Sequence, residues 1–160
     1  YMQSDAYKPT SHFSYHKLIG NTNKATNFEE VVQICENMLK GNPMDLEVRM
    51  MLEYACEQLE WFEFAARHHA FVEGMLKAIF DSGDGKSVAT AWHVLAVAEE
   101  YTALSVMGLK MTGQQLLMVD DRYIDMMTVE ARAESDDPPI DLYFDITRPY
   151  EFLQNMITDE

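Results

Sequence analysis

Asn27-Phe-Glu-Glu-Val31 and Trp61-Phe-Glu-Phe-Ala65 repeat one pattern at a distance of 34 residues. In each copy an aromatic side chain precedes a small or β-branched residue by three positions. This spacing puts the two side chains on one face of an α-helix, one turn apart. A fixed period of this length is typical of stacked helical hairpins. The first prediction is therefore an array of paired helices.

Four helices are expected in residues 27–110, because apolar residues recur there at helical spacing. Asn27 and Asp45 have side chains that cap helix starts, and the segment from Gly41 to Pro43 ends the first helix. The expected helices begin at Asn27 and at Asp45, run from about Trp61 to Phe80, and run from about Ser87 to Met107. The apolar side of the third helix is expected to comprise Phe64, Ala65, Phe71 and Leu76.

Beyond Gly113 the apolar period changes from helical to two, which indicates strands. The best example is Ile140 to Ile146, where apolar and polar residues alternate. Pro149 suits the first position of a final helix. The expected strands are 115–119, 123–131 and 140–146, with a turn at Asp120-Asp121 and a loop at 133–139.

These elements predict an α+β fold in one domain, residues 1–160. Residues 27–110 would form the helix array. Residues 111–160 would form a three-stranded antiparallel β-meander and a terminal helix.

The helical half resembles the tetratricopeptide repeat over residues 27–80, which is about one and a half repeats. Glu53 and Arg49 depart from the pattern, because a small residue and a large aromatic residue are usual there. The residues that match the repeat are Pro43, Leu52, Leu59, Phe62 and Ala65.

This resemblance implies a partner groove on the second expected helix, lined by Met50, Tyr54, Glu57 and Gln58. Grooves that grip a terminal carboxylate use Lys and Asn instead. A groove of Met, Tyr and Glu would prefer an apolar or basic segment of a protein or peptide.

Motifs in the second half carry a resemblance, which covers most of the chain, to a bacterial family known as domain of unknown function 4919. The motifs that carry this resemblance are Ser82-Gly-Asp-Gly-Lys-Ser87, Ala91-Trp-His-Val94, Glu100-Tyr101 and Leu142-Tyr-Phe-Asp-Ile146. It implies an extracytoplasmic bacterial protein, periplasmic or secreted, whose signal segment would precede Tyr1. It implies no activity, ligand or catalytic residue.

The charge of the chain limits its partners. The formal net charge is −15, which disfavours nucleic acids and anionic membrane surfaces, because both are bound through Lys and Arg. Solubility is the simplest explanation of the charge, and a basic partner is another. No apolar run reaches the roughly 18 residues of a membrane span.

No set of residues predicts a catalytic centre, a cofactor or a metal site. Gly85-Lys86-Ser87 resembles the end of a phosphate-binding loop, but Phe80 stands where that motif needs a glycine. Cys35 and Cys56 are expected as buried thiols, with a disulfide as the alternative.

The leading functional hypothesis is a non-catalytic protein-interaction or scaffolding module. The alternative is an extracytoplasmic small-ligand binder or hydrolase that uses the Asp81–Gly85 loop, through Asp81 and Asp84, with His93. A third possibility is a structural part of a longer chain.

Overall fold

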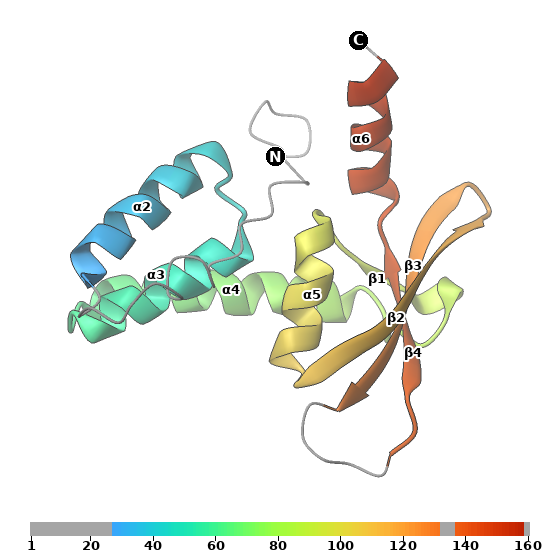
Figure 1. Cartoon of the computed structure of the whole chain (residues 1–160), viewed down its shortest axis with the longest axis horizontal. Coiled ribbons are helices and arrows are strands. Elements are labelled where there is room, and N and C mark those ends of the chain that lie inside the picture. The colour runs from blue at the N-terminus through green and yellow to red at the C-terminus, as the bar shows by residue number, and fades with distance from the viewer. Residues whose placement is uncertain (1–26, 132–136, 159–160) are drawn as a thin grey trace. The chain divides into compact units, whose positions relative to one another are not determined.

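The computed structural model describes residues 27–131 and 137–158, which form two compact units (Figure 1). The first unit ends at Met75 and the second begins at Leu76. This boundary lies inside one helix, α4 (Phe62–Asp81). Most of the predicted loop at 133–139 falls outside the described residues.

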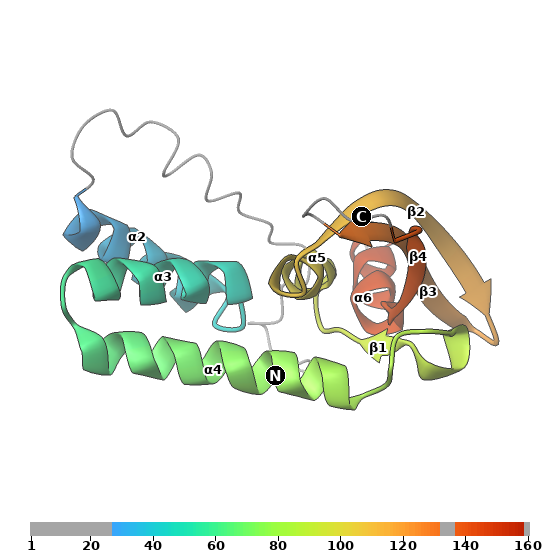
Figure 2. The same cartoon turned by 90° about the horizontal axis from the view of Figure 1, so that it is seen from below.

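The first unit contains α2 (Phe28–Gly41), α3 (Leu46–Gln58) and the beginning of α4. The Asn27 side chain accepts a hydrogen bond from the Glu30 N–H, and the Asp45 side chain accepts one from the Val48 N–H. Both predicted helix starts are therefore confirmed. Figure 2 shows α3 between α2 and the first part of α4.

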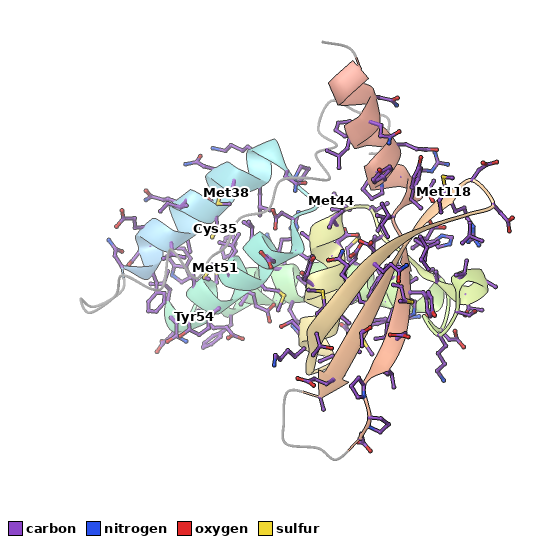
Figure 3. All side chains as sticks on the ribbon, turned by 45° about the vertical axis from the view of Figure 1, so that its right-hand side comes forward. Cys35, Met38, Met44, Met51, Tyr54 and Met118 are labelled. Carbon is purple, nitrogen blue, oxygen red and sulfur yellow. The ribbon has the colours of Figure 1, made fainter. Side chains whose placement is uncertain are left out.

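Side chains from all three helices of the first unit form one core. Figure 3 shows Cys35 on α2 and Met51 on α3 between these helices. The buried members of this core are Val31, Val32, Cys35, Val48, Met51, Leu52, Ala55, Cys56 and Ala65.

Cys35 and Cys56 are both buried free thiols. Burial raises the pKa of Cys35 to about 11, and the nearby Cys56 and Asp45 add to this shift. Burial also raises the pKa of Cys56. Both side chains act as small apolar core residues.

The second unit is built on a mixed four-stranded sheet. Its strands are β1 (Trp92–His93), β2 (Leu109–Val119), β3 (Arg122–Ala131) and β4 (Ile140–Asp145), in the order β1-β4-β3-β2. β2, β3 and β4 pair antiparallel, as the predicted meander requires, and β1 adds a parallel strand beside β4. The prediction of three strands was therefore one strand short.

The predicted helix from Ser87 to Met107 is wrong over its first half and confirmed over its second half. This segment forms a short 3₁₀ turn, η1 (Val88–Thr90), then β1, then the helix α5 (Val97–Val106). Trp92 packs its ring 5.4 Å from that of Phe144 on β4 and donates a hydrogen bond from Nε1 to the Gly83 carbonyl. Phe144 is distant along the chain, and these two contacts of Trp92 outweigh the local helical period.

Two other boundaries also differ from prediction. β2 begins at Leu109, six residues before the predicted start at 115, and Gly113 lies within the strand at an irregularity of its pairing with β3. The last helix, α6 (Thr147–Thr158), begins two residues before Pro149. The Asp145 side chain accepts a hydrogen bond from the Thr147 N–H at this start.

The core of the second unit lies around the central strand β3. Ile124, Met127 and Val129 of β3 are fully buried, as is Phe144 of β4. Among the described residues, no helix has both the length and the apolar character needed to cross a bilayer.

Candidate functional site

Three exposed aromatic side chains lie at the start of α4. Trp61 is 43% exposed, Phe62 66% and Phe64 52%, and we call these three residues the aromatic patch. Ala65, the next residue, is buried in the core of the first unit. Large apolar side chains exposed together are uncommon unless the surface binds something.

A tight turn between α3 and α4 produces this exposure. Glu60 adopts a left-handed backbone with φ of 59°, which reverses the chain after α3. The Trp61 N–H donates to the Cys56 carbonyl at 2.8 Å, and the Glu60 N–H donates to the Glu57 carbonyl at 3.0 Å. These bonds occupy carbonyl groups that the end of a helix leaves unpaired. Trp61, directly before α4, and Phe62, its first residue, are both exposed.

The aromatic patch has a defined geometry. The rings of Trp61 and Phe64 lie 6.3 Å apart at 56°. A hollow of about 430 Å³ is lined by Glu60, Trp61, Phe62, Glu63 and Phe64. The Arg67 guanidinium lies 5.3 Å from the centre of the Phe64 ring, which shows that this ring face accepts a cation.

Acidic side chains surround the aromatic patch. Glu57, Glu60 and Glu63 are all exposed within one turn of it. Exposed carboxylates next to aromatic faces favour a bound group that is both apolar and positively charged.

The prediction that Phe64 belongs to the apolar side of its helix is wrong. The buried residues of α4 are Ala65, Val72, Leu76 and Ile79, and Phe64 precedes this series by one residue. One residue turns a helix by about 100°. The spacing of the buried residues was the signal that could have identified Phe64 as exposed.

The predicted groove residues lie on α3. Tyr54 is 47% exposed and meets the Phe28 ring edge-on at 5.9 Å. Met50 is half-buried, and Glu57 and Gln58 are exposed in the last turn of α3. Glu57 and Gln58 thus lead directly into the turn that carries the aromatic patch.

The two departures from the repeat pattern have specific partners. The Arg49 guanidinium lies 3.6 Å from the centre of the Phe71 ring, and Arg49 Nε donates to the Pro43 carbonyl at 3.0 Å. His69 Nδ1 lies 2.8 Å from a carboxylate oxygen of Glu53. Arg49 thus fills with its planar guanidinium a place where an aromatic ring is usual.

Most of the polar atoms in the Asp81–Gly85 loop bond within the loop and to its neighbours. The Asp84 carboxylate accepts hydrogen bonds from the Thr90 hydroxyl and the Lys86 N–H, which lower its pKa in that order of importance. Asp81 pairs with Lys77. The Gly85 carbonyl accepts from the Tyr143 N–H at 2.9 Å.

His93 has a partner different from those of Asp84. His93 Nε2 lies 3.9 Å from an oxygen of Asp145, its neighbour in the register between β1 and β4. The ring is exposed, whereas Trp92, the preceding residue in the strand, is buried. The use of Asp81, Asp84 and His93 by a ligand or substrate stays a prediction.

A buried pair of carboxyl groups, which the sequence analysis missed, joins α5 to the sheet. Glu100 is 0% exposed and Asp125 4%. Gln114 Nε2 donates to Asp125 at 2.8 Å, and the Tyr101 hydroxyl donates to Gln114 Oε1 at 3.1 Å. No described group donates a hydrogen bond to an ionised Glu100. The signal was present in Glu99-Glu100, two acidic residues within an apolar helix.

Burial favours the protonated form of both carboxyl groups, and Asp125 adds to this effect at Glu100. Burial raises the pKa of Glu100 well above the usual range, and the charge of Asp125 and a hydrogen bond with it act in the same direction. Burial also raises the pKa of Asp125, although hydrogen bonds with Gln114 and Glu100 oppose the shift. Two carboxylates can only accept hydrogen bonds, so a bond between them requires one shared proton.

Comparison with known families decides the classification. The family model described as "Domain of unknown function (DUF4919)" matches residues 1–155. The chain belongs to this family. Neither the curated proteins nor the solved structures gave a match.

In this DUF4919 chain, the resemblance seen in the sequence is thereby confirmed. Its motifs Ser82–Ser87 and Leu142–Ile146 meet in the second unit, where the Gly85 carbonyl bonds to the Tyr143 N–H. Among the described residues, no three His, Cys, Asp or Glu side chains are placed to hold a metal ion.

The turn that carries the aromatic patch can be tested through Glu60. We expect Glu60→Gly to raise the free energy of unfolding by roughly 0.5–1 kcal/mol, because glycine adopts a positive φ without the steric cost of a side chain. Thermal unfolding followed by far-ultraviolet circular dichroism measures the change. Glu63→Gly, the same substitution inside α4, should lower stability by roughly 0.5–1 kcal/mol. A loss of stability in both variants would contradict this account of the turn.

Proposed function

We propose that this chain is a non-catalytic protein-interaction module that binds an apolar, basic peptide segment at the aromatic patch. The observation that carries the proposal is the exposure of Trp61, Phe62 and Phe64 together at one helix start. Exposed aromatic residues of this kind supply much of the binding energy at protein interfaces.

The chemistry of the surroundings selects the partner. Glu60 and Glu63 line the same hollow as the aromatic rings, and the whole chain has a net charge of −15. A segment with Lys or Arg beside large apolar residues would match both the rings and the carboxylates. An acidic segment would be repelled.

The proposal includes a tetratricopeptide-like arrangement of α2, α3 and α4. The 34-residue recurrence and the common core of the three helices support this arrangement. In it, Met50, Tyr54, Glu57 and Gln58 would extend the binding surface from the aromatic patch along α3. The family resemblance adds the proposal that binding takes place outside the cytoplasm.

Synthetic peptides test the proposal. The probes are two labelled peptides of equal length, one alternating Lys with Leu and Phe, the other alternating Glu with Leu and Phe. Fluorescence anisotropy should show binding of the basic peptide only. Phe62→Ala and Trp61→Ala should each weaken binding by roughly tenfold or more, as expected for aromatic residues at the centre of an interface.

The choice of variants separates specific binding from charge attraction. Phe62→Ala leaves the net charge unchanged, so non-specific attraction of a basic peptide would survive it. Ile140→Ala is the control, because Ile140 is also an exposed apolar residue but lies on β4 in the second unit. Tyr54→Ala and Glu57→Lys report whether α3 takes part. Equal binding of the two peptides, or unchanged binding in Phe62→Ala and Trp61→Ala, would refute the proposal.

A further inference from the structure

β2 is an edge strand of unusual length for this sheet. It spans Leu109–Val119, 11 residues, and within residues 27–131 and 137–158 it pairs on one side only, with β3. The opposite edge of the sheet is β1, which has two residues. An edge strand presents backbone N–H and C=O groups that can pair with a further strand.

Little in β2 prevents such pairing. The run from Met111 to Val119 contains no charged residue and no proline, the residues that usually protect an edge. Leu116 is 46% exposed and Met118 is 71% exposed. Figure 3 labels Met118 on this strand. The irregularity between Met111 and Gly113 is confined to one end of the strand. The part from Gly113 to Val119 is therefore open to a partner strand.

The two ends of β2 carry opposite charges. Lys110 lies at the beginning, and the Asp120-Asp121 turn follows the end. In an antiparallel pair of identical strands, the beginning of one strand lies beside the end of the other. A pairing centred on Gln115 places the two Gln115 residues opposite each other and brings Lys110 of each copy opposite Asp120 of the second copy. A parallel pairing would place like charges together.

We propose that β2 pairs antiparallel with β2 of a second copy of this chain, so that two four-stranded sheets join across a two-fold axis. The strand matches itself better than it matches a charged partner. A basic strand would be repelled by Lys110, and an acidic strand would be repelled by Asp120 and Asp121. The middle of β2 has no charge that could attract either one. In the dimer the long edges are paired, and only the short β1 strands remain at the outer edges.

Analytical ultracentrifugation of the full chain over the micromolar range tests the proposal. The expected result is a reversible dimer of the unaltered chain. Gln115→Lys puts two positive charges beside each other at the two-fold axis and should weaken the dimer by roughly tenfold, since cross-strand pairs of like charge are destabilising. Gln115→Thr is the matched neutral control and should retain the dimer. Circular dichroism verifies that each variant keeps its fold.

The charges at the two ends of β2 allow a second, independent test of the dimer. Lys110→Glu should weaken the dimer, because the new carboxylate of each copy then lies beside the negatively charged Asp120-Asp121 turn of the other copy. It also removes the Lys110 Nζ–Glu130 ion pair at 3.2 Å. The dimer affinity of Lys110→Glu is therefore compared with that of Glu130→Gln, which removes the same ion pair and leaves Lys110 in place. A monomer at every concentration, or a dimer that neither Gln115→Lys nor Lys110→Glu weakens, would overturn the proposal.

Discussion

Glu100→Gln is expected to raise the free energy of unfolding at neutral pH by about 1–3 kcal/mol, the usual cost of leaving a buried polar group unsatisfied, here on ionisation of Glu100. Glu100 is fully buried, and none of the described groups donates to its ionised carboxylate. Glutamine keeps the shape of the side chain and brings an N–H₂ group that can donate to Asp125. The substitution should therefore stabilise the second unit, although it changes a buried core residue.

The pH dependence follows from the direction of the shift. Because the pKa of Glu100 is raised in the folded state, the folded chain binds a proton that the unfolded chain releases. The free energy of unfolding therefore falls as pH rises, starting near the ordinary Glu pKa of about 4.3 and continuing up to the raised pKa, by at most about 1.4 kcal/mol per pH unit for one group. In Glu100→Gln this contribution is absent.

Urea unfolding between pH 4 and pH 8, followed by the fluorescence of the buried Trp92, measures both effects. The advantage of Glu100→Gln should be small at the acidic end of about pH 4 and should grow as pH rises. Glu151→Gln, an exposed Glu-to-Gln change on α6, is the control and should leave the pH profile unchanged. A destabilised Glu100→Gln variant, or one with an unaltered pH slope, would contradict the role assigned to this pair.

Gly83→Ala should destabilise the second unit by about 3 kcal/mol, at the upper end of the usual cost of overpacking. A Cβ atom at Gly83 would lie 2.2 Å from the Thr90 carbonyl oxygen and 3.1 Å from that of Ala91. These are backbone atoms, so no side chain can rotate away. The Gly83 carbonyl also accepts the hydrogen bond from Trp92 Nε1 at 3.0 Å, so a shift of this turn would disturb the packing of Trp92.

Gly113→Ala is the matched control for Gly83→Ala within the same unit. A Cβ atom at Gly113 would lie 3.5 Å from the Thr128 Cβ, an ordinary van der Waals distance. Its expected effect is within roughly 1 kcal/mol of zero. Urea unfolding followed by Trp92 fluorescence compares the two variants. If Gly83→Ala were as stable as Gly113→Ala, the close approach of η1 to this turn would be refuted.

Local signals in the sequence predicted the first unit well. Asn27 and Asp45 cap the helices that they were expected to cap, because a capping side chain bonds to a backbone N–H two or three residues away. The alternation from Ile140 to Ile146 likewise predicted β4, since the period of two is a property of the strand itself.

The candidate site was predicted only in part. The repeat pattern pointed to Glu57 and Gln58, which precede the turn and whose role stays a prediction, but not to the aromatic patch. Trp61, Phe62 and Phe64 are apolar residues at helical spacing, and such residues usually belong to a core. Their exposure depends on the reversal at Glu60, a residue type that rarely adopts a positive φ.

The 34-residue recurrence determined by itself that the segment after Asn27 forms paired helices, because helix period and capping are encoded within a few neighbouring residues. The segment from Ser87 to Met107 was decided by the tertiary structure. Its first half has a helical period but contains β1, because Trp92 packs against Phe144 and donates a hydrogen bond to Gly83. The Glu100–Asp125 pair was decided in the same way, since only the packing of α5 on the sheet brings the two carboxyl groups together. Burial of this kind brings together residues that are far apart in the chain, so the local sequence around each residue does not predict it.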